Sequence, residues 1–276
     1  MIRTLGKNQV RIYKQEKIVI NENYDAIGFG AFENKMSLKK LTLPEGLIRI
    51  DKNAFKGCTA LKTLHVPVTL KEIGEAAWMG CTNLLMIEIP NGIRSIPPRT
   101  FKNCLALTQI TLSPSSCLTG IGESAFESCR ELKTIAIPNG VSRIERRTFY
   151  RTKNMKSVVF PENLTFIGKE AFYFSGLEGK LMIPEGVTEI EESAFFRCKN
   201  LTEVFIPGSV KRLGKWTFHG CSRLKYLTIL HDIDEIGEWI INKNDTIIRC
   251  IKGSRVDHYC QSQEFRTEYV NNVAKK

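Results

Sequence analysis

Residues 125–145, AFESCRELKTIAIPNGVSRIE, contain the pattern that decides the fold of this chain. An aromatic residue opens it at Phe126, a proline follows twelve residues later at Pro138, and the next aromatic residue comes at Phe149, 23 residues after the first. Ile135 and Ile137 stand two residues apart, which is the spacing of side chains on one face of a strand. The stretch therefore indicates a short strand that a proline ends, as one unit of a repeat.

The aromatic position, which we call the anchor, recurs along nearly the whole chain. The anchors are Phe32, Phe55, Trp78, Phe101, Phe126, Phe149, Phe172, Phe195 and Phe218, and every interval is 23 residues except one of 25. The prolines twelve residues later are Pro44, Pro67, Pro90, Pro138, Pro161, Pro184 and Pro207, while Pro114 comes one residue late. An insertion around 113–117 explains both irregularities, and we expect it in a surface loop.

A unit of this length cannot bury its apolar residues alone, so neighbouring units must stack, with each strand pairing in parallel with the next at about 4.8 Å. This predicts an α/β solenoid of nine or ten coils over residues 17–250, with a continuous strand ladder. Residues 1–16 would form an N-terminal cap. Residues 251–276 would form a capping helix, N-capped by Ser254, and a tail.

The unit F-x-x-C-x-x-L-x-x-L-x-I-P-x-x-V-x-x-I and the motif K-G-S-x-x-x-x-Y at Lys252 to Tyr259 resemble the BspA-like leucine-rich-repeat family of bacterial and some protist surface proteins. The resemblance covers residues 17 to 270. It implies a right-handed leucine-rich-repeat superhelix with a parallel β ladder on the concave face. It also implies protein binding or adhesion, a host matrix or cell-surface protein as the partner, and a cell-surface or secreted location. It supplies no catalytic residues.

The composition of the 276 residues is that of a folded globular protein, with 42% hydrophobic and 25% charged residues. No stretch approaches the ~18 consecutive apolar residues of a membrane helix, so we expect no membrane insertion. The start, MIRTLGKNQVRIYK, lacks the apolar core of a signal peptide, which keeps a cytoplasmic location as the alternative. The net charge of +11 is consistent with an anionic partner or simply with solubility.

Six cysteines stand three residues after an anchor: Cys58, Cys81, Cys104, Cys129, Cys198 and Cys221. Thr152 and Ser175 occupy the same slot in other coils, which favours a small buried side chain over a metal ligand or redox group. No C-x-x-C pair occurs and the four histidines are scattered, so we predict no metal and no cofactor. Phosphate-binding loops, nucleophile elbows and H-E-x-x-H motifs are absent as well, and we predict that the protein is not an enzyme.

The outward positions of the strands are where such a scaffold binds its partner. They are mostly polar in the early coils, whereas Val159, Met182 and Phe205 would form an exposed apolar stripe in the later ones, with Tyr226 nearby. Such a stripe indicates an interaction site unless another segment covers it. A second aromatic row, Tyr150, Tyr173 and Phe196, follows the anchors of the same coils and would bind or thicken the packing.

Basic residues gather in one short stretch, with only Glu145 opposing them. This basic edge consists of Arg143, Arg146, Arg147, Arg151, Lys153 and Lys156. Two functions follow: a monomeric protein-binding or adhesion scaffold that uses the apolar stripe, or, as the alternative, a carbohydrate or polyanion binder that uses the basic edge. Nucleic acid is not expected as a partner. Steep weakening by salt would distinguish the second from the first.

Overall fold

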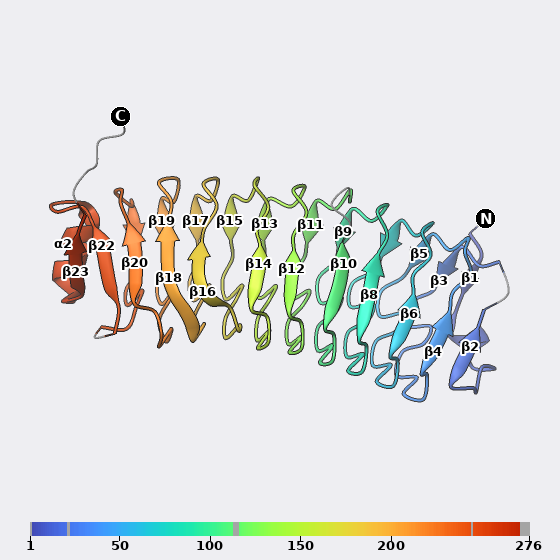
Figure 1. Cartoon of the computed structure of the whole chain (residues 1–276). Coiled ribbons are helices and arrows are strands. Elements are labelled where there is room, and N and C mark those ends of the chain that lie inside the picture. The colour runs from blue at the N-terminus through green and yellow to red at the C-terminus, as the bar shows by residue number, and fades with distance from the viewer. Residues whose placement is uncertain (1, 21–22, 113–115, 244, 271–276) are drawn as a thin grey trace.

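Each 23-residue unit folds into one turn of a right-handed parallel β-solenoid, and about 11 turns stack into a long molecule (Figure 1). The computed structural model describes residues 2–20, 23–112, 116–243 and 245–270. β1 and β2 lie at one end of the stack, and α2 and β23 lie at the other (Figure 1). Helix is confined to the two ends of this described part of the chain.

Two parallel strand ladders run along the molecule, and each coil contributes one strand to each. The strands of the main ladder are β2 (Lys17–Val19), β4 (Lys40–Thr42), β6 (Thr63–His65), β8 (Met86–Ile89), β10 (Gln109–Leu112), β12 (Thr134–Ala136), β14 (Ser157–Val159), β16 (Glu178–Met182), β18 (Asn200–Ile206), β20 (Tyr226–Ile229) and β22 (Ile247–Cys250). The strands of the second ladder are β1 (Thr4–Leu5), β3 (Ala26–Ile27), β5 (Arg49–Ile50), β7 (Glu72–Ile73), β9 (Ser95–Ile96), β11 (Gly120–Ile121), β13 (Arg143–Ile144), β15 (Phe166–Ile167), β17 (Glu189–Ile190), β19 (Arg212–Leu213) and β21 (Glu235–Ile236).

The core is a column of equivalent side chains from successive coils. In β4, for example, Leu41 is buried between exposed Lys40 and Thr42, because alternate side chains of a strand point to opposite faces. All nine anchors are buried, and their ring centroids lie 5.1–5.9 Å from those of the neighbouring anchors. Burial of one such side chain stabilises a fold by about 1.5–3 kcal/mol, so the repeated column is the main source of stability.

The ends of the solenoid differ in part from the sequence prediction. The capping helix is present as α2 (Arg255–Gln263), and the Ser254 side chain accepts a hydrogen bond from the backbone N–H of Asp257 at 3.2 Å. The following residues do not form only a tail, because β23 (Arg266–Tyr269) pairs in parallel with β22 and extends the main ladder. At the N-terminal end the short helix α1 (Lys7–Val10) follows β1, which begins the second ladder.

The prediction of a continuous main ladder is wrong. Strand pairing gives three separate sheets in the described part of the chain, β2 to β10, β12 with β14, and β16 to β23. The first gap lies at the predicted insertion, of which residues 113–115, including Pro114, fall outside the described residues. At the second gap Phe160 occupies a slot that smaller residues fill in other coils, and its ring packs edge-on against Phe172 at 5.9 Å. We attribute the separation of β14 and β16 to this larger ring.

Candidate functional site

The outer side of the main ladder, which we call the ladder face, carries the predicted apolar stripe only in part. Val159 is 60% exposed and Met182 is 52% exposed, whereas Phe205 and Tyr226 are half-buried. Met182 pairs in register with Phe205, while Tyr226 belongs to the neighbouring row and has the Arg249 guanidinium 3.6 Å from its ring centroid. The exposed apolar surface is therefore centred on Val159 and Met182 and is narrower than the sequence suggested.

A groove of about 400 Å³ opens between β14 and β16. The backbone N–H of Glu178 donates to the carbonyl of Lys156 at 3.1 Å, so the strands meet at one end and diverge beyond it. Val159 and Met182 line the two sides of the groove, and Lys156 and Lys180 also line it. The break in the ladder thus turns the predicted stripe into an apolar hollow with charged residues beside it.

The early coils have a comparable hollow of about 330 Å³. It lies where β6 and β8 pair only through Thr63 and Met86, and Thr42 and His65 also line it. Met86 is 54% exposed there, so an exposed methionine occurs at both ends of the ladder face. The early hollow is a natural control surface for the later groove.

The second aromatic row forms a stack parallel to the anchors. Tyr150 and Tyr173 have ring centroids 4.9 Å apart, Tyr173 and Phe196 are also 4.9 Å apart, and His219 continues the stack at 5.8 Å. All four side chains are half-buried. Because each inner ring has neighbours on both faces, this row serves mainly as packing, which agrees with the second of the two predicted roles.

The interpretation of the basic edge is wrong in one respect, because Glu145 is not its only opposing charge. Arg143 pairs with Glu145 at 2.9 Å, but neighbouring coils neutralise three more of its cations. The pairs are Arg146–Glu123 at 3.6 Å, Arg147–Glu170 at 2.5 Å and Lys156–Glu178 at 3.4 Å. The two coils on either side place residues about 23 positions away beside each cation. Only Arg151 and Lys153 of the basic edge have no ion pair among the described residues.

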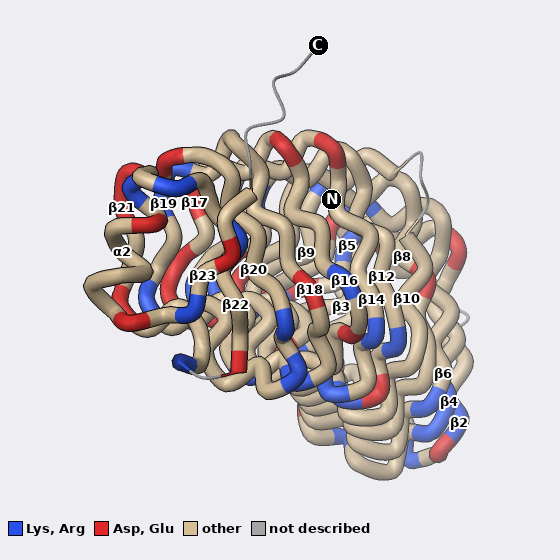
Figure 2. Tube along the Cα trace, turned by 60° about the vertical axis from the view of Figure 1, so that its left-hand side comes forward, with Lys and Arg blue, Asp and Glu red and all other residues tan. Residues whose placement is uncertain are grey.

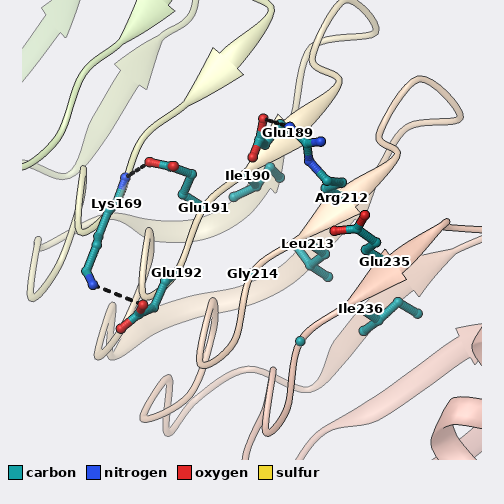
Figure 3. A pocket seen from close by; sticks show the side chains of 11 residues that line it. Lys169, Glu189, Ile190, Glu191, Glu192, Arg212, Leu213, Gly214, Glu235 and Ile236 are labelled. Carbon is teal, nitrogen blue, oxygen red and sulfur yellow. Dashed lines mark hydrogen bonds and ion pairs between the residues drawn. The ribbon is translucent and has the colours of Figure 1, made fainter.

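Ion pairs between neighbouring coils recur along the second ladder and fill a groove of about 450 Å³ there. In Figure 3, Lys169 donates to Glu191 through its backbone N–H at 2.7 Å and to Glu192 through its side chain at 3.0 Å. Arg212 pairs with Glu189, and this hydrogen bond raises the pKa of the guanidinium. Lys and Arg segments lie among Asp and Glu segments along the tube in Figure 2. These charges stabilise one another and leave little to attract a ligand.

The six cysteines lie where the repeat predicts and are buried and free. Burial raises the pKa of the Cys58 thiol to about 12, and the pKa values of Cys81 and Cys104 are raised for the same reason. Such thiols stay protonated at neutral pH and are poor nucleophiles. In the described part of the chain, no three His, Cys, Asp or Glu side chains are grouped so that they could hold a metal ion. Within the same residues, no helix has the length and apolarity needed to cross a membrane.

The stacked coils, the parallel ladder and the buried anchors define the protein as a leucine-rich-repeat solenoid, a fold that is typically a non-catalytic scaffold. The model of the BspA type leucine rich repeat region, in six copies, matches residues 4–119 and 119–248. The chain therefore belongs to the BspA-type leucine-rich-repeat family, as the sequence motifs indicated.

Solved structures with the same fold come from bacteria. A leucine-rich repeat protein from Bacteroides ovatus is 22% identical with a TM-score of 0.77, over 98% of this chain and 88% of that one. A leucine rich cell surface protein from Faecalibacterium prausnitzii is 22% identical with a TM-score of 0.57, over 98% and 84%. One from Eubacterium ventriosum is 18% identical with a TM-score of 0.53, over 90% and 80%. No curated protein matches the sequence. These likenesses establish the fold.

Proposed function

We propose that this chain is a non-catalytic adhesion scaffold that binds a protein partner through the late part of its ladder face, from β14 to β20. The observation that carries this proposal is the groove between β14 and β16, with exposed Val159 and Met182 on its two sides. Exposed apolar surface in a hollow is typical of interaction sites, and the flexible thioether of Met adapts to different partners. Half-buried Phe205 would extend the contact along β18.

The site of action that we propose is a bacterial cell surface or the surrounding medium, with a host matrix or cell-surface protein as the partner. The family and the Faecalibacterium relative, which is described as a cell surface protein, support this assignment. We propose that the chain acts as a monomer. The alternative, a polyanion bound along the whole basic edge, receives less support because four of its six cations are paired with carboxylates.

Site-specific photocrosslinking tests the proposal. A photoreactive residue replaces Met182 in one variant and Met86 in the other, and both are incubated with host matrix and cell-surface extracts. We expect a cross-linked protein at position 182 that is missing at position 86, because the two methionines are similarly exposed on the same face of different coils. The same set of products at both positions would contradict a site in the late coils.

The affinity of the captured partner provides the second measurement. The double variant Met182→Ser, Phe205→Ser should bind about 30-fold more weakly, since a central apolar anchor contributes on the order of 2 kcal/mol. The control Thr42→Ala, Thr63→Ala should bind as the parent does. Affinity should change little between low and high salt, because an apolar contact is not screened. Unchanged binding by the Met182, Phe205 variant would remove the proposed site.

A further inference from the structure

The backbone two residues after each anchor adopts a left-handed conformation in all nine coils that have an anchor. The residues at this position are Asn34, Gly57, Gly80, Asn103, Ser128, Arg151, Phe174, Arg197 and Gly220, with φ between 57° and 79°. Glycine adopts this conformation without strain, and Asn tolerates it better than other residues do. Three consecutive coils depart from this preference, because they place long side chains at the strained position.

Packing does not explain this choice at Arg151 and Arg197, because both side chains are exposed. A smaller residue would satisfy the same backbone, as Gly57 and Gly220 do in other coils. Strained conformations of bulky residues are found preferentially where the side chain has a functional role. The side chains of these coils are therefore the place to look for a ligand site.

Arg151, Phe174 and Arg197 line one pocket of about 330 Å³, which Arg130, Lys153 and Tyr173 complete. Arg130 and Lys153 each stand four residues after an anchor, and in the coil between Lys153 and Lys199 that position is Gly176. A Cβ atom on Gly176 would lie 2.1 Å from the carbonyl oxygen of Lys153, so this coil has no side chain there. The wall of the pocket is cationic on several sides, and no carboxylate lines it.

The cations of this pocket also differ from most others in the molecule in having no ion pair. Arg130, Arg151, Lys153 and Arg197 make none with any described residue, whereas cations nearby pair with the next coil. Lys153 and the adjacent Lys199 have their ammonium groups 5.5 and 5.7 Å from the centroid of the Phe174 ring. The neighbouring carboxylate of Glu131 instead accepts a hydrogen bond from the Asn154 side chain at 2.9 Å. Repulsion among these like charges is relieved when an anion enters.

We propose that this pocket binds the sulfate or phosphate ester groups of a small polyanion. Guanidinium groups form paired hydrogen bonds with tetrahedral oxyanions, and three arginines from different coils line the pocket. The pocket has room for a sugar-sized ligand and not for a duplex. The faces of the Tyr173 ring are covered by Tyr150 and Phe196, so nucleotide bases have no free ring face there to stack on, which disfavours single-stranded nucleic acid. The pocket shares no lining residue with the groove between β14 and β16, so neither proposal depends on the other.

Isothermal titration calorimetry at low salt tests this site with inorganic pyrophosphate, a disulfated disaccharide, its unsulfated parent and a bisphosphorylated monosaccharide. We expect one saturable site for the charged ligands and none for the unsulfated sugar. The tighter of the sulfated and phosphorylated ligands identifies the source of the anion. Affinity should fall steeply as salt rises, because the contacts are ionic. Failure of every charged ligand to bind, or equal binding of both disaccharides, would overturn the proposal.

The variant Arg197→Gly separates binding from folding, because glycine suits the left-handed backbone at this position. We expect at least a roughly tenfold loss of anion affinity with an unchanged or raised melting temperature, since one charge-assisted contact is lost. The matched control is Arg99→Gly, which removes one positive charge at another left-handed position, φ 60°, outside the pocket. Its affinity should stay within about twofold of the parent. Equal losses in both variants would show attraction by net charge alone and would overturn the site.

Discussion

The thiol of Cys104 donates a hydrogen bond to the backbone carbonyl of Trp78 in the preceding coil, with 3.2 Å between sulfur and oxygen. The other five cysteines of this slot make the same contact with the preceding anchor, at 3.1 or 3.2 Å. The slot therefore requires a small buried side chain that can also donate. Thr152 meets both requirements by donating to the carbonyl of Phe149 at 2.8 Å.

The first prediction concerns thiol accessibility. In the native protein, a thiol reagent should label about one equivalent quickly, at exposed Cys117, because the other eight cysteines are buried. After denaturation without reductant it should label all nine, since all are free. Absorbance of the released chromophore measures both numbers. Fewer than about seven thiols in the denatured protein would mean that the cysteines of the core are paired.

The second prediction concerns alkaline pH. Burial raises the pKa of the Cys58 thiol from 9.0 to about 12, so the unfolded chain loses this proton at a lower pH than the folded protein. The stabilisation is complete below pH 9 and is lost as pH rises toward 12. Urea unfolding should show the difference in unfolding free energy between the parent and Cys58→Ala shrinking by about 1.4 kcal/mol per pH unit above 9. A difference that stays constant to pH 10.5 would contradict the burial of this thiol.

The third prediction concerns the anchors. Phe149→Ala should lower the free energy of unfolding by about 3–5 kcal/mol, because it opens a cavity between two stacked rings. Trp78→Phe should cost much less, since the other anchors are Phe and the Trp78 indole N–H is buried without a hydrogen-bond partner. Removing an unpaired buried donor offsets part of the lost contact. Chemical denaturation of both variants checks the order, and a larger loss for Trp78→Phe would contradict it.

The fourth prediction concerns close approach of the backbone. A Cβ atom on Gly214 would lie 2.3 Å from the backbone nitrogen of Glu192 in the preceding coil, so Gly214→Ala must move the two coils apart. Gly208→Ala is the matched control, because a Cβ there meets nothing within 4 Å. We expect Gly214→Ala to lower the melting temperature clearly. Gly208→Ala should leave it unchanged or raise it, by about 0.4–1 kcal/mol of stability. Equal effects would mean that the coils are farther apart.

The fifth prediction concerns the phase of the main ladder. Adjacent residues of β16 point to opposite faces, with Leu181 buried and Met182 exposed. Met182→Ser should change the unfolding free energy by no more than about 0.5 kcal/mol, whereas Leu181→Ala should cost about 2–5 kcal/mol. Denaturation of the two variants measures both values. Unfolding of the Met182→Ser protein would place this side chain in the core.

Much of the fold could be predicted because the repeat states the same local requirement in every coil. Phe126, Ile135 and Ile137 mark the anchor and the inner face of one strand, and the structure buries all three. The separation of β14 from β16 could not be predicted, since it depends on how the Phe160 ring packs against the next coil. β23 was missed because its sequence, RTEY, has no apolar alternation and lies beyond the last repeat.

The candidate sites were predictable to a lesser degree. Val159 and Met182 were identified from their outward position, but the groove beside them was not. The partners of the basic edge could have been found by comparing positions one repeat apart, because Glu123 and Glu170 each stand 23 residues from an arginine of that edge. The same comparison, two and four positions after the anchors, aligns Arg151 with Arg197 and Arg130 with Lys153.

The sequence by itself determined the length of the coil, the buried face of each strand and the small donor in the slot of Cys104. These properties follow from residue identity and spacing, because burial of apolar side chains acts in the same way in every coil. The tertiary structure alone decided which charges are neutralised and where the ladder opens. Arg147 finds Glu170 while Arg151 finds no carboxylate, because ion pairing depends on distances between side chains of different coils.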